Sequence, residues 1–127
     1  MIGSMMYLIA STHLDLNFVL SCLSQFSSYS LKCNYTAVKR VFHYLAGTCT
    51  MSLVYTRHLS IYISLWLTRF SNANYASCYN THHSITHYTF LSNGCAISWL
   101  SKKQNSVLTS TIESEYMALS TLGRQAL

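Results

Sequence analysis

The residues able to do metal or phosphate chemistry are concentrated in one C-terminal stretch. Glu113 and Glu115 are the only glutamates in the chain, and Lys102 and Lys103 lie upstream of them. Carboxylate oxygens are the ligands that Mg²⁺ prefers, and lysine ammonium groups contact phosphate backbones. These residue types could therefore hold a cation or contact a phosphate group. Asp15 is the only other acid, which leaves few carboxylates for a site that binds two divalent ions.

A strand followed by a helix is expected to position these groups. The strand ends at the lysine pair, and a polar loop leads into a helix that begins near Ser110. Ile112, Tyr116 and Leu119 fall at i, i+4 and i+7, so they share one face, and such spacing is typical of core residues. Ser110 and the threonine on either side of it are candidate N-caps. We expect one or both glutamates to point away from the apolar stripe, towards whatever lies over the neighbouring sheet.

The clearest strand signal is a hairpin. Residues 87–92 and 95–100 are separated by Asn93 and Gly94 alone, and this dipeptide accepts the positive φ angles of a type I′ turn. One face of the hairpin is expected to be buried, because apolar residues alternate with polar ones along both runs: Tyr88, Phe90, Cys95, Ile97 and Trp99.

The chain before the hairpin reads as helices and then strands. Apolar spacing predicts a short helix or buried segment at residues 1–10, an amphipathic helix at 16–27, and a third helix that Asn34 caps and Gly47 ends. Two candidate strands follow, of which the second is apolar on both faces like a central strand: residues 51–55 and 60–70. Helices, then a sheet, then one helix make an α+β fold.

Composition bounds the partners. Half of the residues are hydrophobic, 9% are charged, and the net charge is +5, which favours a polyanion such as nucleic acid and argues against disorder. The five cysteines show no CxxC spacing and are expected to be free, mostly buried thiols. We expect no membrane span and no signal peptide. Localisation stays unknown, with an intracellular site expected over a secreted one.

Several motifs carry a family resemblance. S-K-K-Q-N-S-V at residues 101–107, S-T-I-E-S-E-Y-M-A-L at 110–119 and F-S-N-A-N-Y-A at 70–76 resemble the RNase H segment of Copia-type retrotransposon Pol polyproteins. The N-terminal pieces at residues 1–8, 23–26 and 37–48 are similar to the end of the reverse transcriptase of that family. The resemblance implies two domains and a partial, mixed RNase H-like sheet with one packed helix: a helical segment at residues 1–50 and a truncated RNase H-like domain at 51–127.

The same resemblance implies a lost active site. RNase H cleaves the RNA strand of an RNA–DNA hybrid with two Mg²⁺ ions held by carboxylates. By match, Asn72 stands at the family's first aspartate ligand, Asn74 replaces a neighbouring acid, and Glu115 keeps the helical ligand. The later aspartates would lie beyond Leu127. We therefore expect a retrotransposon remnant that is no enzyme and holds no cofactor or metal.

Alternatives remain open. Lys102 and Lys103 could grip nucleic acid, such as an RNA–DNA hybrid, weakly and without cleavage, or they could be a solvated strand end. An active enzyme completed by another chain and a stand-alone secreted effector are further readings. Glu115 could be a solvent-facing helix residue. Four residues could suggest a zinc site, although no second ligand pair completes it: Cys78, His82, His83 and His87.

Overall fold

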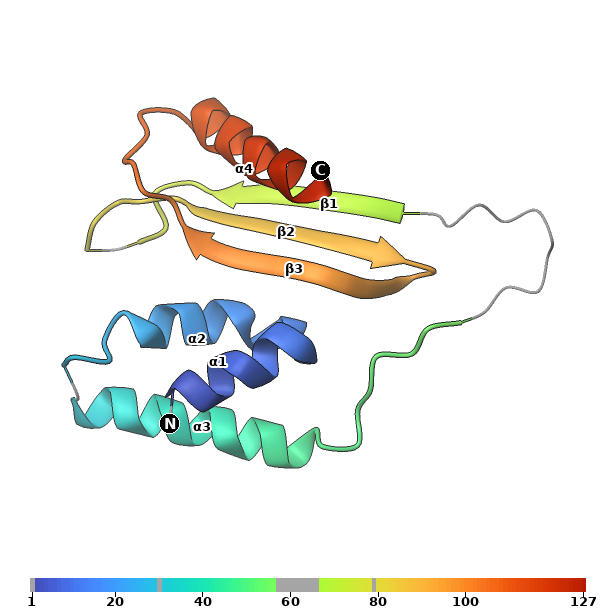
Figure 1. Cartoon of the computed structure of the whole chain (residues 1–127). Helices are drawn as coiled ribbons and strands as arrows, with labels where there is room; N and C mark the ends of the chain where they lie inside the picture. The colour runs from blue at the N-terminus through green and yellow to red at the C-terminus, as the bar shows by residue number, and fades with distance from the viewer. Residues whose placement is uncertain (1, 30, 57–66, 79) are drawn as a thin grey trace. The chain divides into compact units, whose positions relative to one another are not determined.

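The computed structural model describes residues 2–29, 31–56, 67–78 and 80–127. The chain divides into two compact units, Met1–Leu53 and Val54–Leu127, which we call the N-terminal and C-terminal units. The described part of the first unit is helical, and that of the second combines a sheet with one helix (Figure 1). The predicted α+β class is confirmed. The assignment of residues 1–50 and 51–127 to two family domains stays a prediction.

The N-terminal unit packs short helices around an aliphatic cluster. Its elements are α1 (Ile2–Ser11), the 3₁₀ turn η1 (Leu14–Leu16), α2 (Asn17–Ser24) and α3 (Lys32–Gly47). Apolar residues three or four positions apart lie on one face of each α-helix, and these faces meet in one core: Met5, Ile9, Leu16, Leu20, Val38 and Val41. The three helices predicted here are therefore present.

The predicted helix ends need correction. The second helix begins with a 3₁₀ turn and ends at Ser24 instead of continuing to residue 27. The third begins at Lys32, with Leu31 as N-cap, so Asn34 lies inside the helix, where its side chain donates to the carbonyl of Tyr29 (3.1 Å). Gly47 is the last helical residue and has no positive φ, so it is not the left-handed residue we expected.

The described sheet of the C-terminal unit has the order β1-β2-β3. Its strands are β1 (Leu67–Asn74), β2 (Ile85–Ser92) and β3 (Cys95–Lys103), paired only in antiparallel fashion. The parallel pairing expected of a mixed sheet is thus absent from the described residues. The turn between β2 and β3 has φ of 51° at Asn93 and 78° at Gly94, which confirms the hairpin and its turn.

The earlier strand predictions hold only in part. Residues 51–55 are irregular, so no strand forms there. Within the predicted strand at 60–70, residues 60–66 lie outside the described part, and residues 67–70 begin β1 with exposed side chains. In the described sheet β1 is an outer strand and β2 is the central one, because β2 pairs with both β1 and β3. The prediction of a central strand at 60–70 is therefore wrong for the part that the structure describes.

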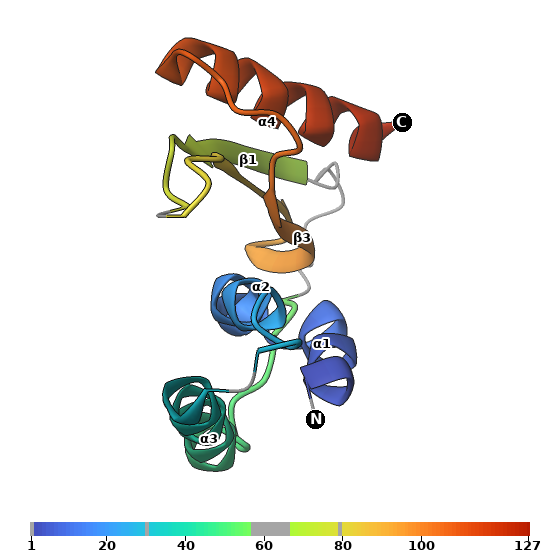
Figure 2. The same cartoon turned by 90° about the vertical axis from the view of Figure 1, so that its left-hand side faces the viewer.

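Helix α4 (Thr111–Ala126) lies along one face of this sheet (Figure 2). Ser114 and Ala118 are fully buried on its inner side. The stripe that we expected to be packed is exposed instead, with 66% of Ile112, 69% of Tyr116 and 51% of Leu119 accessible. Small side chains allow the helix backbone to approach the sheet, which the bulkier stripe would prevent. That packing prediction is wrong.

The predicted alternation of the hairpin fails in β3. Tyr88 and Phe90 are buried as expected, and their rings meet edge to face with centroids 5.5 Å apart. A register shift between Phe90 and Leu91 leaves Ile97 without a partner in β2, and Ile97 is 48% exposed. Trp99 pairs with Thr89, which lies between Tyr88 and Phe90 in β2. The Trp99 side chain therefore lies on the face of the sheet opposite Tyr88 and Phe90.

The five cysteines are free thiols, as predicted, but most of them are not buried. Cys95 is buried, Cys22 and Cys78 are half-buried, and Cys33 and Cys49 are exposed. Among the helices that the structure describes, none combines the length and the apolar character that a membrane crossing requires.

Candidate functional site

Glu115 is the acidic residue that the fold brings to the sheet. It lies in the first half of α4, and its Oε2 accepts a hydrogen bond from the backbone N–H of Ala73 at 3.2 Å. That N–H belongs to the peptide group that joins Asn72 to Ala73. The helical carboxylate and the strand motif at residues 71–74 are therefore neighbours, although 42 positions separate Glu115 from Ala73.

The side chain of Asn72 leaves the strand on the other face. Asn72 pairs with His87 in the register, while Ala73 pairs with Thr86, and successive strand residues point to opposite faces. Thr86 faces α4, because its hydroxyl accepts from Gln104, whose side chain also donates to the carbonyl of Ser114 in α4. Asn72 is exposed. The Glu115 carboxylate thus contacts the peptide group that joins Asn72 to Ala73, but the side chain of Asn72 lies on the face of the sheet opposite α4.

Glu113 serves the helix start. Ser110 is the N-cap, and its hydroxyl accepts from the Glu113 N–H at 3.2 Å, so one of the three candidate caps is confirmed. In return, Glu113 Oε2 accepts from the Thr109 N–H (3.0 Å) and hydroxyl (3.1 Å), which resembles a capping box shifted by one residue. These hydrogen bonds, led by the one from the Thr109 N–H, lower the pKa of Glu113.

The third acid is also engaged. Asp15 in the N-terminal unit accepts a hydrogen bond from the hydroxyl of Tyr44. Each of the three carboxylates therefore has its own protein partner: Tyr44 for Asp15, Thr109 for Glu113 and Ala73 for Glu115. Within the described ranges, no three side chains of His, Cys, Asp or Glu lie close enough together to hold a metal ion.

The cysteine–histidine segment forms a tight loop before β2. The backbone N–H of His82 donates to the carbonyl of Cys78 at 2.7 Å, and His82 has a φ of 50°. The hydroxyl of Thr81 donates to Cys78 Sγ at 3.0 Å, and this bond is the main cause of a lowered Cys78 pKa. Burial lowers the pKa of His87. Cys78, His82, His83 and His87 are not brought together as a group that could hold a metal.

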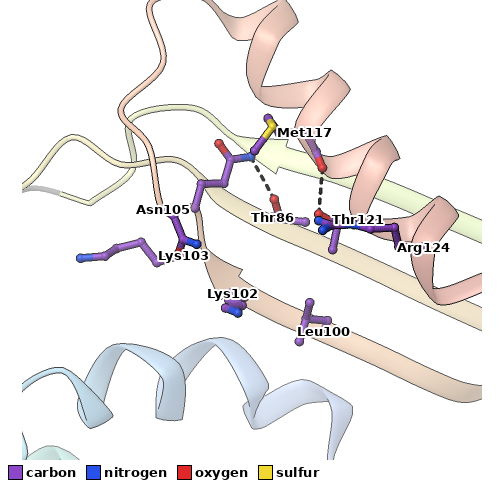
Figure 3. A pocket seen from close by; sticks show the side chains of 9 residues that line it. Thr86, Leu100, Lys102, Lys103, Asn105, Met117, Thr121 and Arg124 are labelled. Atoms are coloured by element: carbon purple, nitrogen blue, oxygen red, sulfur yellow. Dashed lines mark hydrogen bonds between the residues drawn. The ribbon is translucent and has the colours of Figure 1, made fainter.

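The lysine pair is divided by the strand. Lys102 pairs with Thr86 and faces α4, whereas Lys103 pairs with Ile85 on the opposite face. The ammonium of Lys103 lies 3.5 Å from the hydroxyl oxygen of Thr81. In Figure 3 the Lys103 side chain extends away from the other labelled residues. The two lysines predicted to act together thus leave β3 on opposite faces.

Lys102 and Lys103 both contribute to a hollow beside α4. The hollow has a volume of about 120 Å³ and lies between the end of β3 and the C-terminal half of the helix (Figure 3). Its helical wall contains Met117, Thr121 and Arg124, at i, i+4 and i+7. Arg124 was missed from the sequence. Two features of the sequence could have found it: Arg124 follows Met117 and Thr121 at helical spacing, and a basic residue is typical of the last turn of a helix.

The relatives of this chain include an effector protein and several Pol polyproteins. The chain is 38% identical over 125 residues to "Secreted RxLR effector protein 161" of Plasmopara viticola, covering 98% of this chain and 85% of that protein. It is 33% identical over 124 residues to the "Retrovirus-related Pol polyprotein from transposon TNT 1-94" of Nicotiana tabacum, covering 98% of this chain and 9% of the polyprotein. The corresponding RE2 polyprotein of Arabidopsis thaliana is 33% identical over 118 residues, covering 93% and 8%.

These matches run along nearly the whole chain, which spans less than a tenth of either polyprotein. No profile of a known protein family matches, and no solved structure does. The matched Pol polyproteins are of the family that the motifs at residues 1–48 and 70–119 resemble. This chain belongs to the family of Copia-type, retrovirus-related Pol polyproteins from transposons.

Proposed function

We propose that this member of the Pol polyprotein family is an RNase H-like segment without nuclease activity. The observation that carries the proposal is the environment of Glu115. In the described part of the chain it is the one carboxylate hydrogen-bonded to β1, and the residue preceding its partner Ala73 is an asparagine. The matching family motif has an aspartate where this chain has Asn72.

The physical argument concerns charge. Two divalent cations must lose part of their hydration shells to bind, and clustered carboxylates compensate for this loss. An asparagine oxygen is neutral, so Asn72 and Asn74 contribute no charge. Glu113 accepts hydrogen bonds at the start of α4, and the Glu115 oxygen is hydrogen-bonded to backbone. One negative charge at this place is too little to hold two Mg²⁺ ions for phosphodiester hydrolysis.

A hybrid-cleavage assay tests the proposal. The purified chain is incubated with a labelled RNA–DNA hybrid in Mg²⁺ and, separately, in Mn²⁺, with an active ribonuclease H as positive control. The expected result is intact RNA. Glu115→Gln is the matched control, because it removes the remaining family ligand and keeps the size of the side chain. Metal-dependent cleavage by the native chain that disappears in Glu115→Gln would overturn the proposal.

Nucleic-acid binding without cleavage is a second candidate function. It is supported by the net charge of +5 and by the hollow where Lys102 and Arg124 face the same space. Binding to an RNA–DNA hybrid or a single strand should weaken as salt rises, because lysine and arginine displace counterions from phosphates. Fluorescence anisotropy at a series of salt concentrations measures this. An absence of binding at low salt would exclude it.

A stand-alone effector is a third candidate. It is favoured by the length of one match, because the chain spans 85% of the secreted RxLR effector protein. An antibody against this chain would decide whether the source cells release it, with a resident intracellular protein as the control for lysis. Retention of the chain inside intact cells would count against this candidate.

A further inference from the structure

The hollow beside Lys102 is lined by three cationic residues, Lys102 and Lys103 of β3 and Arg124 of α4. Lys102 is in β3 and Arg124 is in the last turn of α4, so neither sequence proximity nor one element's periodicity brings them together. Figure 3 shows the two side chains with Leu100 and Thr121 around the same space. Asn105 lies at the rim and carries amide N–H donors. The lining therefore combines three positive charges with neutral polar groups, and the Lys103 ammonium is directed away from the other two, toward Thr81.

Nothing in the described part of the chain neutralises the charges of Lys102 and Arg124. Neither Lys102 nor Arg124 has an ion-pair partner among the described residues, and no acid lines the hollow. The two acids of the C-terminal unit are engaged elsewhere, Glu113 with Thr109 and Glu115 with Ala73. Uncompensated cations that line one hollow raise the positive potential there.

The walls are fixed by a buried glutamine. Gln104 Nε2 donates to the hydroxyl of Thr86 (2.9 Å) and to the carbonyl of Ser114 (3.1 Å), so it ties β2 to α4. The Gln104 N–H also donates to the carbonyl of Ser84 at 2.9 Å. Because these bonds hold the end of β3 against the helix, the positions from which Lys102 and Arg124 project are set before any ligand arrives.

We infer that this hollow binds one phosphate group of a nucleic-acid backbone, with Lys102 and Arg124 as its two cationic contacts. Guanidinium groups match phosphate oxygens bidentately, and a lysine ammonium adds a point charge. The hollow has a volume of about 120 Å³, which leaves room for a phosphate group. The inference rests on the nucleic-acid binding proposed above and replaces the predicted Lys102–Lys103 pair.

The first test measures affinity and its salt dependence. Anisotropy titrations of a labelled RNA–DNA hybrid compare the native chain with Lys102→Gln, Arg124→Gln and the double variant. Each substitution should weaken binding about threefold and reduce the slope of log K against log salt by about 0.7 to 0.9. Lys32→Gln, on the surface of the N-terminal unit, removes the same charge elsewhere and should have a smaller effect. Circular dichroism checks that every variant keeps its fold.

Two results of this test would overturn the inference. In the first, the double variant binds with the affinity and salt slope of Lys32→Gln, while the native chain still binds; nucleic-acid binding would then stand without this site. In the second, Lys103→Gln weakens binding as much as Lys102→Gln, which would contradict the assignment of the two cationic contacts to Lys102 and Arg124.

A second measurement separates the sources of phosphate. Inorganic phosphate and then the oligonucleotide are titrated into ¹⁵N-labelled protein. The expected result is saturating shifts of the amides at residues 102–105 and 121–124 with both, lost in the double variant. Shifts with inorganic phosphate alone would retain the site but overturn the nucleic-acid source, together with the proposed nucleic-acid binding. Shifts with neither ligand would overturn the site itself.

Discussion

The carboxylate of Glu115 accepts a hydrogen bond from the backbone N–H of Ala73, and this bond joins α4 to the outer strand of the described sheet. An outer strand presents backbone groups that no neighbouring strand satisfies. Glu115 covers one of them. The residue that the family resemblance assigns to metal binding thus has a structural role in this chain, and that role can be tested separately from catalysis.

Replacing Glu115 should loosen this edge. Glu115→Ala should lower the free energy of unfolding by about 1 kcal/mol, because the Ala73 amide loses its acceptor in a half-buried place. Glu115→Gln should cost less, since its amide oxygen can still accept. Urea denaturation measures the stability, and hydrogen exchange of the Ala73 amide reports the bond itself.

Ser120→Ala, at an exposed position of the same helix, is the control for general effects of substitution in α4. Its unfolding free energy should stay within about 0.5 kcal/mol of the native value. An Ala73 amide that exchanges equally fast in the native chain and in Glu115→Ala would contradict the proposed structural role.

Gln104 should matter more for stability than its polar side chain suggests. Gln104→Ala removes the two hydrogen bonds that tie Thr86 to the Ser114 carbonyl and leaves both acceptors in a buried place. We expect a loss of about 1 to 3 kcal/mol, measured by urea denaturation. Asn105→Ala is the matched control, because Asn105 is the next residue and is exposed. Equal stabilities of the two variants would show that the tie contributes nothing.

What could be predicted from the sequence was local. The hairpin turn follows from Asn93 and Gly94, and the helix start follows from Ser110, because each depends on neighbouring residues alone. The contact of Glu115 with Ala73 has no local signal, since it depends on how α4 settles on the sheet. The division of Lys102 from Lys103 was available in principle, because consecutive strand residues point to opposite faces.

The face of α4 was predicted wrongly for a physical reason. Hydrophobicity alone favoured Ile112 and its partners, but the distance between helix and sheet is set by the size of the side chains between them. Ser114 and Ala118 are small enough to lie there, and both are fully buried. A pattern of small residues was thus the better guide to the packed side of this helix than a pattern of large ones.

The stability of the C-terminal unit should fall in acid through Glu113. Hydrogen bonds from Thr109 hold the pKa of Glu113 below its ordinary value of 4.5. A carboxylate with a lowered folded-state pKa contributes stability that is present above the unfolded pKa, and it loses that contribution as pH falls through the folded pKa. The loss should therefore appear below pH 4.5. Urea unfolding of the native chain and of Glu113→Gln over this range measures it.

The difference between these two curves isolates Glu113 from the other acids. It should be constant at neutral pH and shrink below pH 4.5, where the native carboxylate takes up its proton. Ser110→Ala removes the N-cap hydroxyl but no titrating group. It should lower the free energy of unfolding by a similar amount at every pH, so that the dependence on pH keeps its shape. A difference that does not depend on pH would contradict the assignment of the lowered pKa to the bonds with Thr109.

The outer stripe of α4 should tolerate charge, in contrast to its inner side. Ile112→Lys and Leu119→Lys place a charge on exposed positions, so the unfolding free energy should change by no more than about 0.5 kcal/mol. Ala118→Leu adds volume between helix and sheet, where no space is accessible, and should cost about 1 to 3 kcal/mol. Urea denaturation measures both, and the reverse order of effects would restore the packing that the sequence predicted.

Removal of exposed apolar surface should also raise the solubility of the two lysine variants, because exposed apolar patches promote association.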